Sequence, residues 1–113
     1  MKTLTIEIAD RKTANKRFLS AARGRRQGEF LSFPDIELLH KVLTPKRMRI
    51  LQKLQRIGPI GLRALARALE LDAGNLQRDV KQLQNFGLVK ESEDGLFVPY
   101  DEIRLEVVIK RVA

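Results

Sequence analysis

Capping and stop residues divide the segment from Thr44 to Gly87 into three short helices, and this division constrains the fold more than any other feature of the chain. Thr44 can cap the first helix, and Pro45 suits the next position because the first helical N–H has no intrahelical partner. Gly58-Pro59 is expected to end that helix. Apolar residues recur at helical spacing in all three stretches: Ile50, Leu51, Leu54 and Ile57; Leu62, Leu65, Ala66 and Leu69; Leu76, Val80 and Leu83.

A hairpin is predicted directly after the third helix. Asp72 can cap that helix, which follows a second helix beginning after Ile60-Gly61, and Gly87 is expected to end it. The short apolar stretches 88–90 and 96–98 then flank Glu93-Asp94-Gly95, a pattern typical of two strands joined by an Asp-Gly turn.

Further elements are predicted on both sides of this segment. Leu4, Ile6 and Ile8 alternate with polar residues, which indicates a half-buried strand over 4–8, and the same alternation predicts a closing strand over 103–109. Between them we expect a helix over 11–22, a short strand over 28–33, and a helix from Pro34, in its first turn, to Leu43. Because an isolated strand is marginal in water, the first and last strands are expected to pair with each other or across a two-fold axis.

The 113 residues are enough for one domain with its own core. We predict an α+β fold, mainly α, in three parts: an N-terminal strand-helix extension (1–43), a three-helix and hairpin unit (44–100) and a C-terminal strand segment (101–113). The chain has no cysteine, which excludes disulfides, thiol nucleophiles and Cys-type zinc sites. A single histidine, His40, leaves no His-pair metal site, so we expect neither an enzyme nor a cofactor. The opening residues do not form a secretory signal, and a cytoplasmic protein without membrane contact is expected.

The net charge of +8 indicates a polyanionic partner, most often a nucleic acid. The charge is unevenly spread along the chain. Residues 44–90 hold ten basic and three acidic residues, whereas residues 91–113 hold three basic and six acidic ones. The helical segment is therefore the expected nucleic-acid surface.

Five short motifs in this segment resemble the small MarR-type winged-helix regulators of bacteria and archaea. They are LTPKR (43–47), LRALARAL (62–69), RDVKQL (78–83), GLV (87–89) and VPYDEI (98–103). The resemblance implies a winged helix-turn-helix that binds double-stranded DNA. The N-terminal segments 3–9 and 32–47 are similar to a subgroup that acts as the antitoxin of toxin–antitoxin pairs.

The third helix presents side chains suited to a DNA groove on the face opposite its apolar one: Gly74, Asn75, Gln77, Arg78 and Lys81. Arg can bond guanine bidentately, Asn and Gln can pair with adenine, and Lys can reach a phosphate. Gly74 would let the helix N-terminus approach a phosphate closely. The alternative is an ordinary solvated face.

Three cations at the starts of the first two helices are further candidates for phosphate contact: Lys46, Arg47 and Arg63. Positive charge at a helix N-terminus interacts unfavourably with the helix dipole. Stabilisation of the helix is therefore not the first explanation for Lys46 and Arg47. A solvated run of charges is the alternative.

Three features depart from the usual pattern or extend it. The predicted hairpin carries acidic residues, which argues against a minor-groove contact there. Glu70 lies in the turn where many helix-turn-helix sequences have glycine, which suggests an unusual angle between the helices. Arg23-Gly24-Arg25 resembles the core of a minor-groove arm, although a solvated basic loop explains it as well.

Two functions are favoured on the sequence alone, and RNA binding is a third possibility, although aromatic residues, on which RNA bases stack, make up only 5% of the chain. The first is a sequence-specific transcriptional regulator, an autoregulating antitoxin-type repressor that binds DNA as a homodimer. The second is an antitoxin that neutralises a cognate toxin through its N-terminal third, with weak or no DNA binding.

Overall fold

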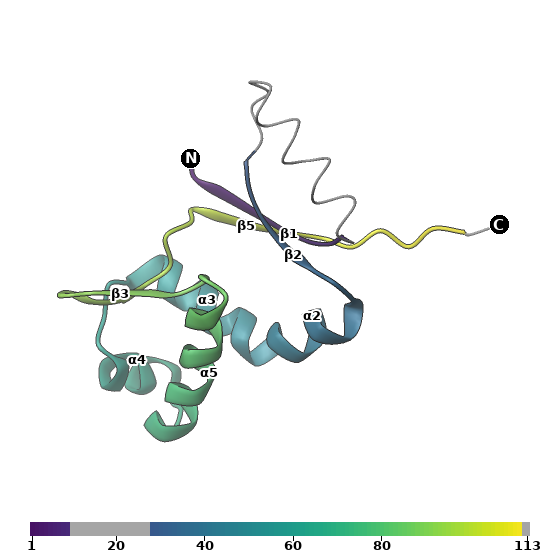
Figure 1. Ribbon diagram of the computed structural model, residues 1–113. Helices are drawn as coiled ribbons and strands as arrows, with labels where there is room; N and C mark the ends of the chain where they lie inside the picture. The colour runs from purple at the N-terminus through teal and green to yellow at the C-terminus, as the bar shows by residue number, and fades with distance from the viewer. Residues whose placement is uncertain (10–27, 112–113) are drawn as a thin grey trace.

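The computed structural model describes residues 1–9 and 28–111, which form four helices and two sheets (Figure 1). In chain order the elements are β1 (Thr3–Ile8), β2 (Glu29–Phe33), α2 (Ile36–Val42), α3 (Pro45–Ile57), α4 (Leu62–Leu69), α5 (Ala73–Asn85), β3 (Lys90–Ser92), β4 (Gly95–Phe97) and β5 (Glu102–Glu106). The α+β class is as predicted. The helix predicted over 11–22 and the basic motif at 23–25 lie outside the described residues.

Local capping chemistry sets the helix ends. The Thr44 hydroxyl accepts the backbone N–H of Arg47 at 3.2 Å, and the Asp72 carboxylate accepts that of Asn75 at 2.9 Å, so both predicted N-caps are confirmed. The start predicted for α2 was wrong. Asp35 is its N-cap and accepts the Leu38 N–H at 2.8 Å, so Pro34 precedes the helix instead of lying in its first turn.

The larger sheet is parallel, with β1 between β2 and β5. Leu4 and Ile6 face the core, but Thr5 and Glu7 on the other face of β1 are also buried. The prediction of a half-buried first strand was therefore wrong, because a central strand of a parallel sheet is covered on both faces. The Ser32 hydroxyl of β2 donates to the Glu7 carboxylate at 2.9 Å.

The first and last strands pair directly with each other, which is one of the two pairings expected. The register runs from Thr3 opposite Glu102 to Glu7 opposite Glu106. The last strand was predicted to reach residue 109 but ends at Glu106. Since β1 itself ends at Ile8, residues 108–111 have no neighbour among the described strands of this sheet, and they continue past its end (Figure 1).

The hairpin of β3 and β4 turns one residue earlier than predicted. Ser92 lies opposite Gly95, so Glu93 and Asp94 form the turn and Gly95 begins the second strand. Gly95 has φ +126°, and a Cβ there would lie 2.6 Å from the carbonyl carbon of Ile60. Ile60 exchanges two backbone hydrogen bonds with Leu96, so the glycine allows the segment between α3 and α4 to dock on the hairpin.

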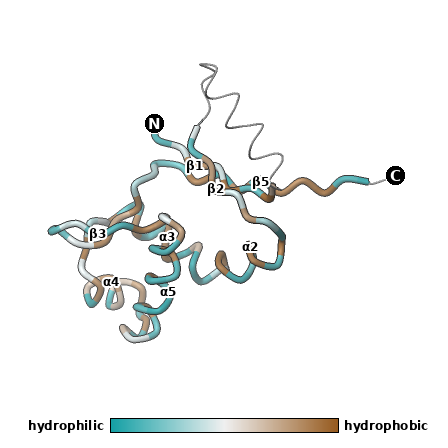
Figure 2. Tube along the Cα trace, viewed as in Figure 1, coloured by the Kyte–Doolittle hydropathy of each residue, from teal (hydrophilic) through white to brown (hydrophobic). Residues whose placement is uncertain are grey.

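One hydrophobic core joins the parallel sheet to the helices and the hairpin. It includes Leu4 and Ile6 of β1, together with residues of α2, α3, α4 and α5. The ring of the buried Phe33, at the end of β2, stacks on that of the partly buried Phe86, at the end of α5, with their centroids 5.3 Å apart. Figure 2 shows apolar residues along the segments that meet in this core. None of the described helices is long and apolar enough to cross a membrane.

Candidate nucleic-acid interface

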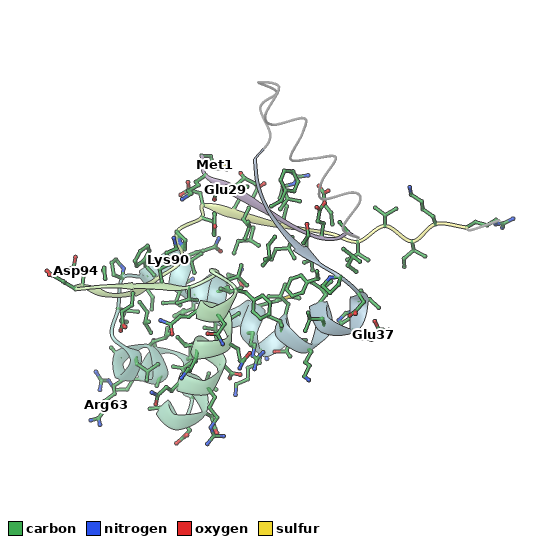
Figure 3. All side chains as sticks on the ribbon, in the orientation of Figure 1. Met1, Glu29, Glu37, Arg63, Lys90 and Asp94 are labelled. Carbon is green, nitrogen blue, oxygen red and sulfur yellow. The ribbon has the colours of Figure 1, made fainter. Side chains whose placement is uncertain are left out.

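Helix α5 has one buried and one exposed face. Leu76, Val80 and Leu83 are buried, as predicted. The predicted polar set, Gly74, Asn75, Gln77, Arg78 and Lys81, is exposed. In Figure 3 side chains of α5 project away from the body of the molecule. The arrangement leaves the amide and cationic groups of the helix available to an external ligand.

A groove of about 610 Å³ lies between α2 and α5. Its floor includes the apolar residues Leu38, Val42 and Phe86, and among the described residues that line it four are basic and none is acidic: Lys41, Arg47, Arg78 and Lys81. A groove of one charge sign attracts and concentrates an anionic partner. The sequence analysis did not name Lys41 as a candidate, although it lies on the polar side of a predicted helix. Its position near α5 depends on how α2 and α5 pack, which the sequence pattern does not show.

Arg47 links three helices. Its Nε donates to the Asp79 carboxylate of α5 at 3.0 Å, and its Nη1 donates to the carbonyls of Lys41 and Val42 at 3.2 and 3.1 Å. The guanidinium group thereby satisfies carbonyls at the end of α2 that have no helical partner. The cation at the start of α3 thus has a stabilising role, which the helix-dipole argument did not anticipate.

Lys46 approaches the same carboxylate, with its Nζ 3.1 Å from Oδ2 of Asp79. Burial alone would raise the pKa of Asp79, but hydrogen bonds and charge from Arg47 and Lys46 outweigh it and lower the pKa below its ordinary value. Two positive charges therefore share one carboxylate, and the cluster keeps one net positive charge. The Lys46 side chain is 43% exposed and stays open to solvent, whereas that of Arg47 is 17% exposed.

The N-terminus of α5 already holds an anionic group of the chain itself. The Asp72 carboxylate accepts the Asn75 N–H there, and a Cβ on Gly74 would lie 3.2 Å from Oδ2 of Asp72. Gly74 consequently makes room for the cap. A phosphate at this helix end would face the Asp72 carboxylate, so the positions further along α5 suit an anion better.

Arg63 lies at the start of α4 and points into solvent (Figure 3). Within the described ranges, Arg63, Arg78 and Lys81 form no ion pair. A second group of cations, Arg49, Lys53 and Arg56, lies along α3 beside the last residue of α4. The described structure thus offers two basic surfaces, of which only the α5 surface combines cations with the predicted amide side chains.

Acidic residues gather on the hairpin, where Glu91 lines a small pocket together with Gln77 and Lys81 of α5. Glu91, Glu93 and Asp94 are exposed there, and Figure 3 places Asp94 at the far end of the hairpin. His40 is exposed on α2. In the part of the chain that the structure describes, no three His, Asp or Glu side chains are grouped as a metal site would need.

Comparison with known proteins identifies a family for this chain. No curated protein matches the chain. The family model HVO_A0114 matches residues 42–105, which run from the last residue of α2 into β5 and contain all of α3, α4, α5 and the hairpin. The matched segment contains all of α5 and the α3 basic surface, while Lys41 of the groove lies just before it, and it spans more than half of the chain. The protein therefore belongs to the HVO_A0114 family.

Proposed function

We propose that this protein is a sequence-specific, DNA-binding transcriptional regulator that reads the major groove with α5 and acts on the DNA upstream of its own gene. The observation that carries the proposal is the exposed face of α5. There Asn75, Gln77, Arg78 and Lys81 lie beside a basic groove and opposite a buried apolar face.

The order of elements supports a winged helix-turn-helix. Helices α4 and α5 are joined by residues 70–72, the length of turn typical of that motif. Glu70 adopts the left-handed conformation, with φ +56° and ψ +45°, that glycine usually provides at a helix C-terminus. Glu70 therefore takes the backbone conformation usual for glycine at this point, and the unusual angle between α4 and α5 stays a prediction. The hairpin follows α5 and is bridged to the segment between α3 and α4 through Ile60 and Leu96, which supports its proposed role as a wing.

Each candidate side chain has a defined part in this proposal. Arg78 can bond O6 and N7 of guanine, and Asn75 and Gln77 can pair with adenine in the major groove. Lys81, Lys41 and Arg63 can contact phosphates on either side of α5. Lys46 can add to the local positive potential, while Arg47 holds α5 in place through Asp79. The acidic hairpin tip is expected to stay out of the minor groove.

The assembly we propose is a homodimer whose two α5 helices lie roughly 34 Å apart and read half-sites one DNA turn apart. The antitoxin function stays a prediction. Co-purification with the product of the neighbouring gene would test it directly.

The proposal is tested by the affinity of Arg78→Ala for the DNA upstream of its gene and for a scrambled duplex of the same length. We expect a loss of about 1–3 kcal/mol on the upstream DNA and a much smaller loss on the scrambled DNA, because a base contact carries sequence preference. Fluorescence anisotropy at fixed salt measures both affinities.

Arg56→Ala is the matched control, since Arg56 is an exposed arginine of the α3 basic surface. We expect its base preference to equal that of the wild type. If Arg56→Ala abolished the preference and Arg78→Ala left it unchanged, α5 would not be the recognition helix. If the wild type bound neither duplex, the regulator function would be wrong.

A further inference from the structure

Strand β5 forms a free edge of the parallel sheet. The strand order is β2-β1-β5, and among the described strands only β1 pairs with β5. An open edge presents a row of backbone donors and acceptors to any strand that can reach it.

The backbone groups on this edge can be assigned from the pairing with β1. The Glu102 N–H donates to the Lys2 carbonyl at 3.2 Å, so Glu102 faces β1. Because backbone groups alternate in direction along a strand, those of Arg104 also face β1, and those of Ile103 and Leu105 face outward.

Apolar side chains continue along this edge and past its end. Leu105 is 45% exposed, and Val107, Val108 and Ile109 beyond the strand are 41%, 72% and 95% exposed. Figure 2 shows this stretch as an apolar tail leading away from the sheet. Beside the edge lies an open groove of about 320 Å³. Its apolar lining comes from β1, β5, α3 and the residue after α2, and is formed by Ile6, Leu43, Met48, Leu51, Ile103 and Leu105; the polar side chains of Arg49, Gln52 and Gln55 from α3 complete it.

We propose that this edge binds a second copy of the chain, with the two β5 strands antiparallel and Leu105 opposite Leu105 across a two-fold axis. Two such strands extend the two sheets into one of six strands, and the outward backbone groups of each Leu105 bond to the partner's Leu105. The same register pairs Ile103 with the partner's Val107, so the tail gains the strand neighbour that β1 does not provide.

Charge favours this register over its neighbours. Arg104 comes to lie opposite the partner's Glu106, and the reverse pair forms by symmetry. A shift of one residue per strand along the edge would place Glu106 opposite the partner's Glu106, which is destabilising. Within one chain, Nη1 of Arg104 lies 3.5 Å from Oε1 of Glu102, and its Nε lies 3.7 Å from Oε1 of Glu106. Both ion pairs are exposed and contribute little to stability.

Side chains fit the same arrangement. In a strand, Val107 points to the same face as Ile103 and Leu105, which line the groove beside α3. The partner's Val107 and Ile109 therefore enter that groove, and an apolar surface on each copy is covered by the other. The apolar tail and the groove that receives it both occur on this chain. A second copy of the chain is therefore the partner that fits the edge.

The inference deepens the homodimer proposed above, but it requires no DNA, and its test is made without DNA. Analytical ultracentrifugation of the full chain at tens of micromolar should give a dimer. Val107→Lys should shift it to a monomer, because the lysine would enter the groove. Val108→Lys is the matched control and should stay dimeric, since residue 108 faces the partner's Glu102.

The register is tested by exchanging the charges. Arg104→Glu should raise the dimer dissociation constant by about tenfold, because Glu would then lie opposite Glu. The double variant R104E/E106R should restore it. Circular dichroism reports whether each variant is folded.

A folded wild type that sediments only as a 13 kDa monomer would overturn the inference, as would a dimer that Val107→Lys leaves intact. Loss of the dimer in Arg104→Glu without recovery in the double variant would overturn the register. If the wild type is a monomer and Arg78 still determines its base preference, the proposed dimer interface is wrong and the proposed DNA-binding function is not affected.

Discussion

At the scale of single residues, Asp79 decides how α5 is presented. Its carboxylate lies beside Arg78 in the sequence but turns inward, where it binds Arg47 and Lys46 from the start of α3. An unpaired carboxylate here would weaken the positive potential around Arg78 and Lys81. The ion pairs remove that charge and fix the helix, so Arg78 remains on the outer face.

The ion pairs make stability depend on acid pH. Because the pKa of Asp79 is lowered in the folded protein, its carboxylate stabilises the fold above its unfolded pKa, about 3.8, and this contribution is lost as the pH falls through the folded value. We expect the free energy of unfolding of the wild type to fall between about pH 5 and pH 3 more steeply than that of Asp79→Asn.

Urea denaturation at pH 7, 5 and 3 measures this difference. At pH 7 Asp79→Asn should be less stable by about 1–2 kcal/mol, since Arg47 and Lys46 lose a half-buried charged partner. At pH 3 the two proteins should come closer together. A constant gap from pH 7 to pH 3 would show that Asp79 is not the titrating group.

At the scale of elements, the hairpin is held to the helices by backbone contact as well as by side chains. Ile60 bridges Leu96, and Gly95 beside it has a positive φ and no space for a Cβ. The position of the hairpin against the segment between α3 and α4 thus depends on one glycine that the Ile60 backbone approaches closely.

Gly95→Ala should therefore lower the free energy of unfolding by about 2–4 kcal/mol, because the new methyl group meets the Ile60 backbone and the conformation is strained for alanine. Thermal unfolding measures the loss. Gly61→Ser is the control: a Cβ at Gly61 meets nothing within 4 Å, and the residue is the N-cap of α4. The free energy of unfolding of Gly61→Ser should equal or exceed that of the wild type, because serine is a better N-cap than glycine. Equal losses in both variants would contradict the close-approach argument.

The helices were predictable because their ends depend on local chemistry. Thr44 and Asp72 cap helices with their own side chains, and the residues they cap lie three positions away. The strands were less predictable because pairing is decided far along the chain. Nothing near Glu7 reveals that two strands flank it, and nothing near residue 107 reveals where β1 ends.

The candidate interface was likewise predictable only where it depends on local sequence. Helical spacing alone separated Arg78 and Lys81 from the buried residues of α5. The roles of Arg47 and Lys41 depend on how α2, α3 and α5 pack together, and 32 residues separate Arg47 from Asp79. Sequence periodicity carries no information about such contacts.

At the scale of the whole molecule, three surfaces of different chemistry are separated. The basic groove lies beside α5, the hairpin tip is acidic, and the β5 edge with its tail is apolar. Figure 1 shows the parallel sheet on one side of the molecule and the start of α5 on the other. A dimer formed through β5 would therefore leave both α5 helices free to meet DNA.

The separation of surfaces predicts how Lys41 affects DNA binding. A lysine that contacts a phosphate releases a counterion, so its removal weakens binding to all sequences and flattens the salt dependence. Lys41→Ala should reduce the slope of log affinity against log salt by about 1 for each bound protomer, with equal losses on upstream and scrambled DNA. Affinities measured at several salt concentrations give the slope. Lys53→Ala, on the α3 basic surface, should leave it unchanged. A flatter slope for Lys53→Ala with an unchanged one for Lys41→Ala would move the phosphate contacts from the α2–α5 groove to α3.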